Sequence, residues 1–110
     1  MNQTEEAYEK AIQVLEKCAT PHGFHAAHPG YQGVWARDSN ITSLGASLLG
    51  DKFKQTFKQS LMILAKNQSE KGQIPNAVLC HEKPIKADYK SIDSTLWYII
   101  GNFVYAKAYN

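Results

Sequence analysis

Residues 92–108 form a predicted helix that is apolar on nearly every side, so other structure must cover it. A second predicted helix starts at Asp38 or Ser39 and ends before Gly50. Its outward positions hold Ser, Thr and Asn instead of Lys or Glu, and we expect it to be covered on most sides as well. In the predicted helix of residues 92–108, apolar residues recur at spacings of three and four. They are Ile92, Leu96, Ile99, Ile100, Phe103 and Val104, and the apolar face is widened by Trp97, Tyr98 and Tyr105.

Two more helices are predicted from the same periodicity. One covers residues 5–19, with Thr4 as a suitable N-cap. The other covers residues 52–67 after Asp51 and turns its lysines toward water. Only Gly50 and Asp51 separate this helix from the one before it, and a link that short predicts an antiparallel helical hairpin.

A long loop joins the last two predicted helices. Gly72, Pro75 and Pro84 break residues 68–90 into turns, and only residues 78–80 suggest a short extended piece. No longer alternation of polar and apolar residues indicates a sheet. The sequence therefore predicts an all-α fold of two helical hairpins, which offers few partners for two well-covered helices. We expect the chain to be part of a larger helical assembly or to self-associate through its exposed helix faces.

Composition and charge exclude several classes of function. The formal net charge is only +2 and the lysines are spread along the chain, so a nucleic-acid interface is not expected. No apolar run reaches the ~18 residues of a membrane span, and the polar N-terminus does not resemble a signal peptide. The two cysteines lie outside any CxxC pair and suit a reducing compartment, so we expect a cytoplasmic protein.

The common cofactor and metal motifs are also missing from the sequence. There is no P-loop, no GxGxxG and no GxSxG, so neither a nucleotide cofactor nor a serine nucleophile is predicted. His22, His25 and His28 form an HxxHxxH pattern in a Gly- and Pro-rich loop with no carboxylate or cysteine close by in sequence. Because metal sites usually add such ligands on a helix or a tight turn, we predict no metal and no cofactor.

The segment GVWARDSNITSLG places an aromatic ring, a cation and a carboxylate where a loop becomes a helix. Arg37 brings a rigid fork of donors, and Asp38 beside it brings acceptors, which together match vicinal sugar hydroxyls. Trp35 offers a flat face that could stack on a pyranose ring. The simpler interpretations stay open: Asp38 could be only a helix N-cap, and Trp35 only a core residue.

A second acidic helix start lies in DYKSIDSTLWYI, after the long loop. If Ser91 caps this helix, Asp93 falls in the first turn, where the helix dipole favours its charge and leaves it free to face a cleft. The simpler interpretation is again structural, because acidic first turns are routine.

With these residues identified, the sequence resembles the six-hairpin glycosidases, and most closely the glucosidase domain of glycogen-debranching enzymes (amylo-alpha-1,6-glucosidases). The likeness covers about residues 30–105, and three blocks carry it in order. VWARDSNITSLGASLLGD resembles the family's Trp-x-Arg-Asp segment before an inward-facing helix. GQIPNAV resembles its Gly-x-Ile-Pro-Asn turn, and YKSIDSTLWYI resembles its Tyr-x-x-x-Asp-x-Thr-Leu-Trp stretch.

The resemblance implies an (α/α)6 barrel of alternating inner and outer helices, of which residues 1–110 would make about a third, as a partial glycosidase domain. The second and fourth helices would be inner ones, with Asp38 and Asp93 at the same rim. By the same resemblance, Arg37 and Asp38 would hold hydroxyls of the terminal sugar. Trp35 would form part of the wall of the sugar subsite. Asp93 would either hold another subsite residue in place or contact a sugar hydroxyl itself.

The implied function is a part of a glycoside hydrolase that acts on α-glucans or glucosides, with carbohydrate as the partner. Inverting hydrolysis needs an acid and a base whose carboxyl groups lie about 6.5–9.5 Å apart, and the family takes these from later hairpins. Neither Asp38 nor Asp93 has sequence surroundings that would keep it protonated, so no catalytic residue is predicted. The chain is expected to be an N-terminal fragment that is inactive alone. The alternative is a non-enzymatic helical module that binds sugar or another protein.

Overall fold

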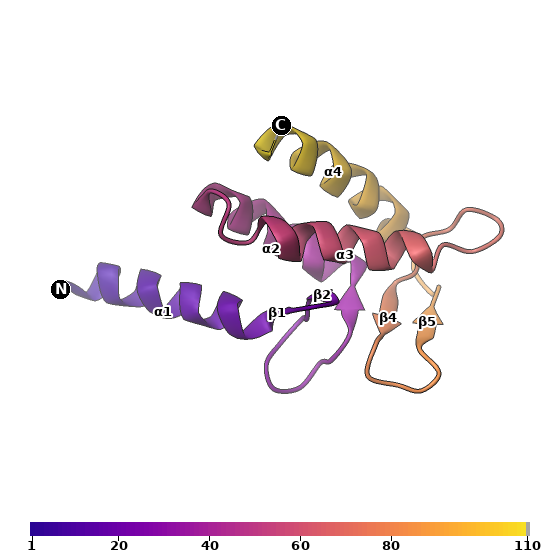
Figure 1. Ribbon diagram of the computed structural model, residues 1–110, viewed down its shortest axis with the longest axis horizontal. Helices are drawn as coiled ribbons and strands as arrows, with labels where there is room; N and C mark the ends of the chain where they lie inside the picture. The colour runs from indigo at the N-terminus through magenta and orange to yellow at the C-terminus, as the bar shows by residue number, and fades with distance from the viewer. Residues whose placement is uncertain (110) are drawn as a thin grey trace.

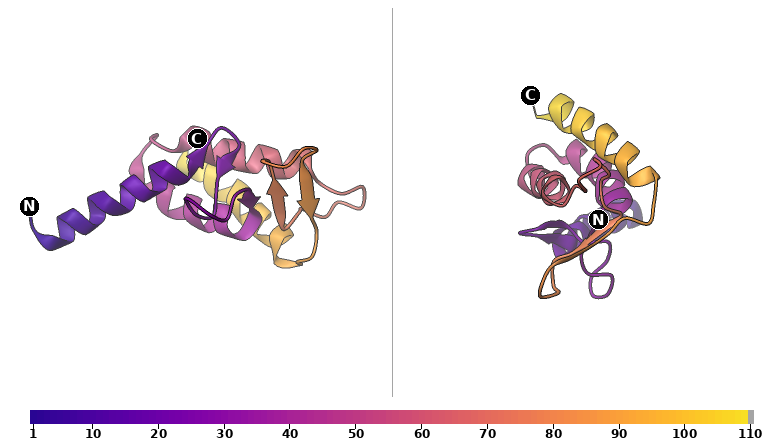
Figure 2. Two further views of the ribbon diagram at one scale, coloured as in Figure 1. Left: turned by 90° about the horizontal axis from the view of Figure 1, so that it is seen from below. Right: turned by 90° about the vertical axis from the view of Figure 1, so that its right-hand side faces the viewer.

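The computed structural model describes residues 1–109 (Figure 1). Helices take up 54% of the chain and strands 11%. Two views show that α2 and α3 lie between α4 on one side and the strands on the other (Figures 1 and 2). The elements in chain order are α1 (Gln3–Cys18), β1 (Ala19–Thr20), β2 (Gly23–Phe24), β3 (Val34–Trp35), α2 (Ala36–Ala46), the 3₁₀-helix η1 (Ser47–Leu49), α3 (Lys54–Lys66), β4 (Ala77–Leu79), β5 (Lys86–Asp88) and α4 (Asp93–Ala108).

The strands form two small antiparallel sheets that the sequence did not predict. In the first, β1 pairs with β2; in the second, β4 pairs with β3 on one edge and β5 on the other. Within the second sheet Ala77 is the register partner of both Trp35 and Asp88. Strands of two or three residues are too short to show an alternating pattern, so only the extended piece near residues 78–80 could be anticipated.

The prediction of an all-α fold, built as two helical hairpins of an (α/α)6 barrel, is therefore wrong. The chain has a mixed α/β fold, in which α1 leads directly into the β1–β2 hairpin and β3 leads directly into α2 (Figure 1). The physical reason is that the long connections between helices satisfy their backbone groups by pairing with each other. The connecting segments thus pack against the helices as well as linking them.

Helix starts differ from the predicted ones by one to three residues. Asn2, and not Thr4, caps α1, because its side chain accepts a 2.8 Å hydrogen bond from the Glu5 amide. Asp51 does not cap α3, which begins at Lys54 after a turn.

The core lies between the helices and the sheets, in two clusters of buried residues. One joins α2, α3 and the three-stranded sheet, and the other joins the end of α1 to the two-stranded sheet and the start of α3. The members are Val34, Ala36, Leu64, Ile74 and Val78 in the first cluster, and Cys18, Phe24, Ala46 and Phe53 in the second.

Helix α2 is well covered, as predicted, whereas α4 is not. The contact between the two is close at one point, where a Cβ atom added to Gly101 would lie 1.8 Å from Oδ1 of Asn40. Asn40 is itself buried and donates a 2.7 Å hydrogen bond to the Ala36 carbonyl. On α4 only Ser94 and Gly101 are buried, so most of its apolar surface faces outward.

Both cysteines are free thiols, Cys18 buried and Cys80 half-buried. Burial raises the pKa of each thiol. Among the helices of residues 1–109, none is long and apolar enough to span a lipid bilayer.

Candidate functional site

The start of α2 is fixed by the sheet that precedes it. Trp35 is the N-cap residue in an extended conformation, paired with β4, and the Ala36 amide donates a 2.9 Å hydrogen bond to the Asn76 carbonyl. These backbone contacts start the helix two residues before Asp38, so Asp38 lies in the first turn and is not the N-cap. Its carboxylate is therefore not committed to capping and stays half-exposed.

A glycine permits this close approach of β3 to β4. Gly33 has φ +99°, and a Cβ atom placed on it would lie 2.8 Å from the Val78 carbonyl oxygen. Any other residue there would combine an unfavourable backbone conformation with a steric clash.

The start of α4 is fixed by residues of the GQIPNAV block. The Gln73 side chain donates hydrogen bonds to the carbonyls of Tyr89 (2.7 Å) and Ser91 (3.2 Å). The Ile74 amide donates one to the Thr95 hydroxyl at 3.2 Å. Because the carbonyl of Asn76, in the same block, accepts the hydrogen bond from Ala36 at the start of α2, this block fixes the positions of the α2 and α4 starts relative to each other.

Arg37 lies between the two carboxylates that the sequence singled out. Its Nε atom is 3.6 Å from Oδ1 of Asp38, and its Nη1 atom is 3.6 Å from Oδ2 of Asp93. The structure thus brings together two acids that are 55 positions apart in the sequence (93 − 38). Both contacts are longer than a hydrogen bond, so the guanidinium N–H groups remain able to bind other oxygens.

The three side chains are partly open to solvent, with exposed fractions of 47% for Arg37, 39% for Asp38 and 40% for Asp93. Both acids occupy the first turns of helices, where the positive end of the helix dipole favours negative charge.

A recess of about 350 Å³ opens beside this cluster. That volume lies within the range of small-molecule sites. Tyr31 packs edge-on against Trp35 with ring centroids 6.3 Å apart. The indole N–H of Trp35 is buried and has no hydrogen-bond partner within residues 1–109. The lining residues are Ala26, Tyr31, Trp35, Arg37 and Asp38.

Three of the four predicted site residues, Trp35, Arg37 and Asp38, line this recess, and Asp93 joins them through Arg37. The arrangement combines a fork of donors, a carboxylate acceptor and two aromatic rings. Such a set suits a neutral ligand with an apolar face and a rim of hydroxyl groups.

Sequence reasoning missed Tyr31 as a wall of the recess and Gln73 as the residue that orients the start of α4. An aromatic residue four positions before Trp35 in the same loop was a usable signal for Tyr31. Nothing in the sequence singled out Gln73, because its partners are backbone carbonyls.

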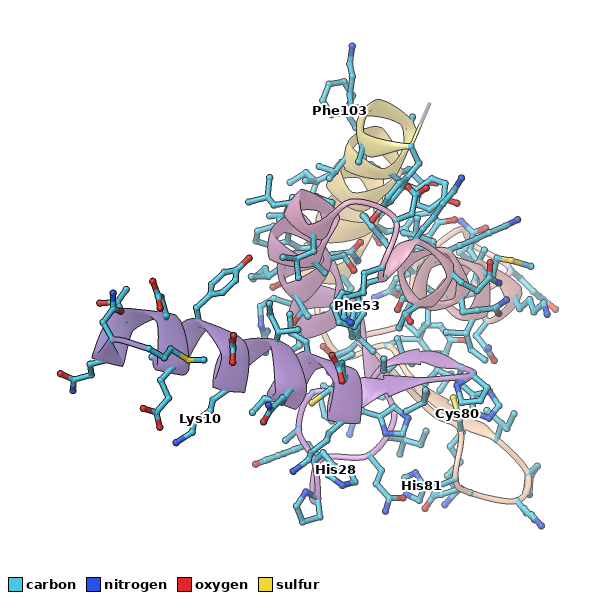
Figure 3. The ribbon with its side chains drawn as sticks, turned by 60° about the vertical axis from the view of Figure 1, so that its left-hand side comes forward. Lys10, His28, Phe53, Cys80, His81 and Phe103 are labelled. Carbon is cyan, nitrogen blue, oxygen red and sulfur yellow. The ribbon has the colours of Figure 1, made fainter. Side chains whose placement is uncertain are left out.

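No histidine is among the residues that line this recess, and Figure 3 shows His28 and His81 on loops below the helices. Burial is the main cause that lowers the pKa of His25, and the charges of His22, His81 and His28 lower it further. No group of three or more His, Cys, Asp or Glu side chains within the described part of the chain is arranged to hold a metal ion.

Comparison with known proteins identifies the family. The family model described as amylo-alpha-1,6-glucosidase matches residues 9–110. Searches of curated proteins and of solved structures gave no match. The matched segment contains the recess, both acidic helix starts and the GQIPNAV block between them. The chain therefore belongs to the amylo-alpha-1,6-glucosidase family, a family of glycogen-debranching-type glucosidases.

Proposed function

We propose that this chain forms part of the sugar-binding site of a glycoside hydrolase that acts on α-glucans or α-glucosides. Arg37 and Asp38 bind hydroxyl groups of one sugar residue, Trp35 stacks on the apolar face of its ring, and Asp93 positions Arg37. The observation that carries the proposal is the placement of Arg37 at the edge of an aromatic recess, between two carboxylates contributed by two helix starts.

The chemistry of the cluster supports a neutral ligand. Two carboxylates offset the charge of one guanidinium, so the cluster does not favour a strongly anionic ligand. A sugar hydroxyl both donates and accepts, and it can bridge Arg37 and Asp38 at once.

The same geometry favours binding over catalysis by this chain alone. Inverting hydrolysis needs the glycosidic bond and a water molecule between two carboxyl groups, and here the Arg37 side chain contacts both carboxylates. Asp38 and Asp93 are therefore assigned to binding, and no acid and base pair is assigned within the chain. This contact also supports the second candidate, a non-enzymatic sugar-binding module.

The test is a titration of the ¹⁵N-labelled chain with maltose and isomaltose, followed by NMR. We expect saturable shifts at tens of millimolar sugar for the amides of residues 35–38 and the Trp35 indole. Arg37→Gln should weaken binding by about 10- to 100-fold, because a hydrogen bond to a charged group contributes roughly 1.5–3 kcal/mol.

Lys52→Gln is the matched control, because Lys52 has the same 47% exposure and forms a 3.0 Å surface ion pair with Glu16 away from the recess. Equal weakening by both variants, or no shifts at residues 35–38, would refute the sugar site. Glucose release from an α-1,6-linked oligosaccharide separates the candidates: release that Arg37→Gln abolishes would assign catalysis to the chain, and no release fits the binding role.

A further inference from the structure

The loop between β2 and β3, residues 25–33, takes part in two recesses. We call it the His25 loop. Ala26 and Tyr31 of this loop line the recess beside Arg37. Other residues of the loop, together with Lys17 of α1 and Thr20 of β1, line a second recess of about 390 Å³. The loop residues of the second recess are His25, Ala27, His28, Pro29, Gly30 and Gln32. A movement of the loop would therefore change both recesses.

The two ends of the His25 loop are held by the strands that flank it. Before the loop, the Phe24 amide donates a buried 2.9 Å hydrogen bond to the Ser60 hydroxyl. After the loop, β3 pairs with β4. The His25 amide donates a 2.9 Å hydrogen bond to the carbonyl of Cys18, which ties the start of the loop to the end of α1. In the middle, a Cβ atom added to Gly30 would meet no atom within 4 Å among residues 1–109. The middle of the loop thus has room to move between fixed ends.

The four histidines of the sequence gather around the start of this loop. The charges of three of them act on His25: His22 from the β1–β2 turn, His28 from the loop itself, and His81 from the β4–β5 turn. Figure 3 shows His28 and His81 on loops below the helices. Lys17, which lines the second recess with His25, adds a further positive charge. When these groups are protonated, they repel a proton on His25.

The other polar groups around His25 do not offset this positive charge. Ser60, from α3, is uncharged. Burial raises the pKa of the Cys18 thiol, which therefore stays protonated and neutral. Glu82, in the β4–β5 turn, lies 3.7 Å from the Lys86 ammonium group. The Nε2 atom of His25 is buried and has no hydrogen-bond partner within residues 1–109. A proton added there therefore creates a charge without a partner.

We propose that the His25 loop makes the recess beside Arg37 sensitive to pH: when His25 takes up a proton, its imidazole moves out into water and the loop withdraws Ala26 and Tyr31 from the recess. This inference rests on the proposed sugar site, whose affinity it regulates. The arrangement described above is the closed loop, in which burial and the nearby histidines lower the pKa of His25 from 6.5. The open loop therefore takes up the proton first as the pH falls below 6.5, so the recess is complete above that pH and is lost below it.

The loop movement is tested without sugar, by NMR of the ¹⁵N-labelled chain from about pH 7.5 to about pH 5.0. We expect the amides of Ala26 and Tyr31 to shift with the same midpoint as the His25 ring. The amides of Leu64 and Val78, in the core, should not follow it. Unfolding of the whole chain over this range, or amides of Ala26 and Tyr31 that do not follow His25, would overturn the proposal.

The effect on the site is tested with maltose at the same two pH values. Binding should be about three- to tenfold weaker at the lower pH, because uptake of one proton changes an equilibrium by at most about tenfold per pH unit. His25→Gln should bind maltose like the parent at the higher pH and should lose this weakening at the lower pH. His22→Gln is the matched control, because His22 is exposed in the β1–β2 turn, and it should keep the weakening. Equal pH dependence in the parent and His25→Gln would overturn the proposal.

A reciprocal measurement separates this proposal from the sugar site itself. Saturating maltose should lower the midpoint of the His25 ring by about 0.5–1 pH unit, since linkage makes the effects of proton and sugar on each other equal. Maltose binding at the higher pH with an unchanged His25 midpoint would support the sugar site and overturn its link to His25. If maltose bound at neither pH, the sugar site would be refuted, and the titration without sugar would still decide whether the loop moves.

Discussion

Gly101 is the position where the packing of α4 on α2 leaves no room for a side chain. A Cβ atom added there would lie 1.8 Å from Oδ1 and 2.8 Å from Cγ of Asn40, and 3.2 Å from a methyl carbon of Leu61. The Asn40 amide is buried and hydrogen-bonded, so it cannot simply turn outward. Gly101→Ala must therefore displace either the helix or the amide.

The cost follows from three contributions. Overpacking a filled interface costs about 1–3 kcal/mol, and loss of the buried Asn40 hydrogen bond costs about 1–3 kcal/mol. The better helix propensity of alanine returns about 1 kcal/mol. We expect a net loss of about 1–5 kcal/mol in the free energy of unfolding, or roughly 5–25 °C in Tm for a domain of this size.

Urea and thermal unfolding followed by circular dichroism measure this loss. Gly45→Ala is the matched control, because Gly45 lies within α2 with no atom within 4 Å of its added Cβ. That variant should be about 0.5–1 kcal/mol more stable than the parent. Asn40→Ala should make room for the new methyl group, so the double variant should be about 1–2 kcal/mol more stable than the sum of the single effects. If Gly101→Ala raised stability as Gly45→Ala does, the close packing of the two helices would be refuted.

Three further predictions concern the segments around the site. Gln73→Ala should lower stability by about 1–3 kcal/mol and weaken sugar binding several-fold in the NMR titration, although Gln73 does not line the recess. Because burial lowers the pKa of His25 from its usual 6.5, the unfolded chain takes up a proton first as the pH falls. The free energy of unfolding therefore falls as the pH drops below 6.5, because the folded chain holds His25 neutral. In urea titrations, this free energy should depend less on pH in His25→Gln than in His22→Gln. Gly33→Ala should destabilise the fold by about 1–3 kcal/mol more than Gly30→Ala, because both have positive φ but only Gly33 would clash with a neighbouring carbonyl; equal losses on urea unfolding would contradict this.

The parts of the fold that the sequence predicted are those with a long regular pattern. Helices α1 and α4 begin within two residues of the predicted starts, because their periodicity extends over four turns. The expectation that Asp38 and Asp93 would lie at one end of the molecule agrees with their shared contact to Arg37. That expectation came from the family resemblance, since no pattern within the sequence relates two positions so far apart. Their role in sugar binding remains a prediction.

The parts that could not be predicted depend on contacts between distant segments. Asp38 has the chemistry of an N-cap, but the pairing of β3 with β4 starts the helix at Ala36 and moves the carboxylate into the first turn. Burial of α4 was inferred from its composition, yet composition says only that a helix can be covered. The exposed Leu96 and Phe103 show that the covering surface is not supplied by residues 1–109.

Helix α1 extends away from the body of the molecule (Figure 2), and Cys18, its last residue, is the only one that is buried. Most of the stability of a helix in a protein comes from packing of its apolar face, and the first turns of α1 have no buried residue to supply it. They open and close by local fraying, at a free-energy cost far below that of global unfolding. We therefore expect two rates within one chain. The N-terminal turns of α1 should be cleaved by proteases and exchange their amide hydrogens quickly. The amide hydrogens of α2 and α3 should exchange only when these two helices separate.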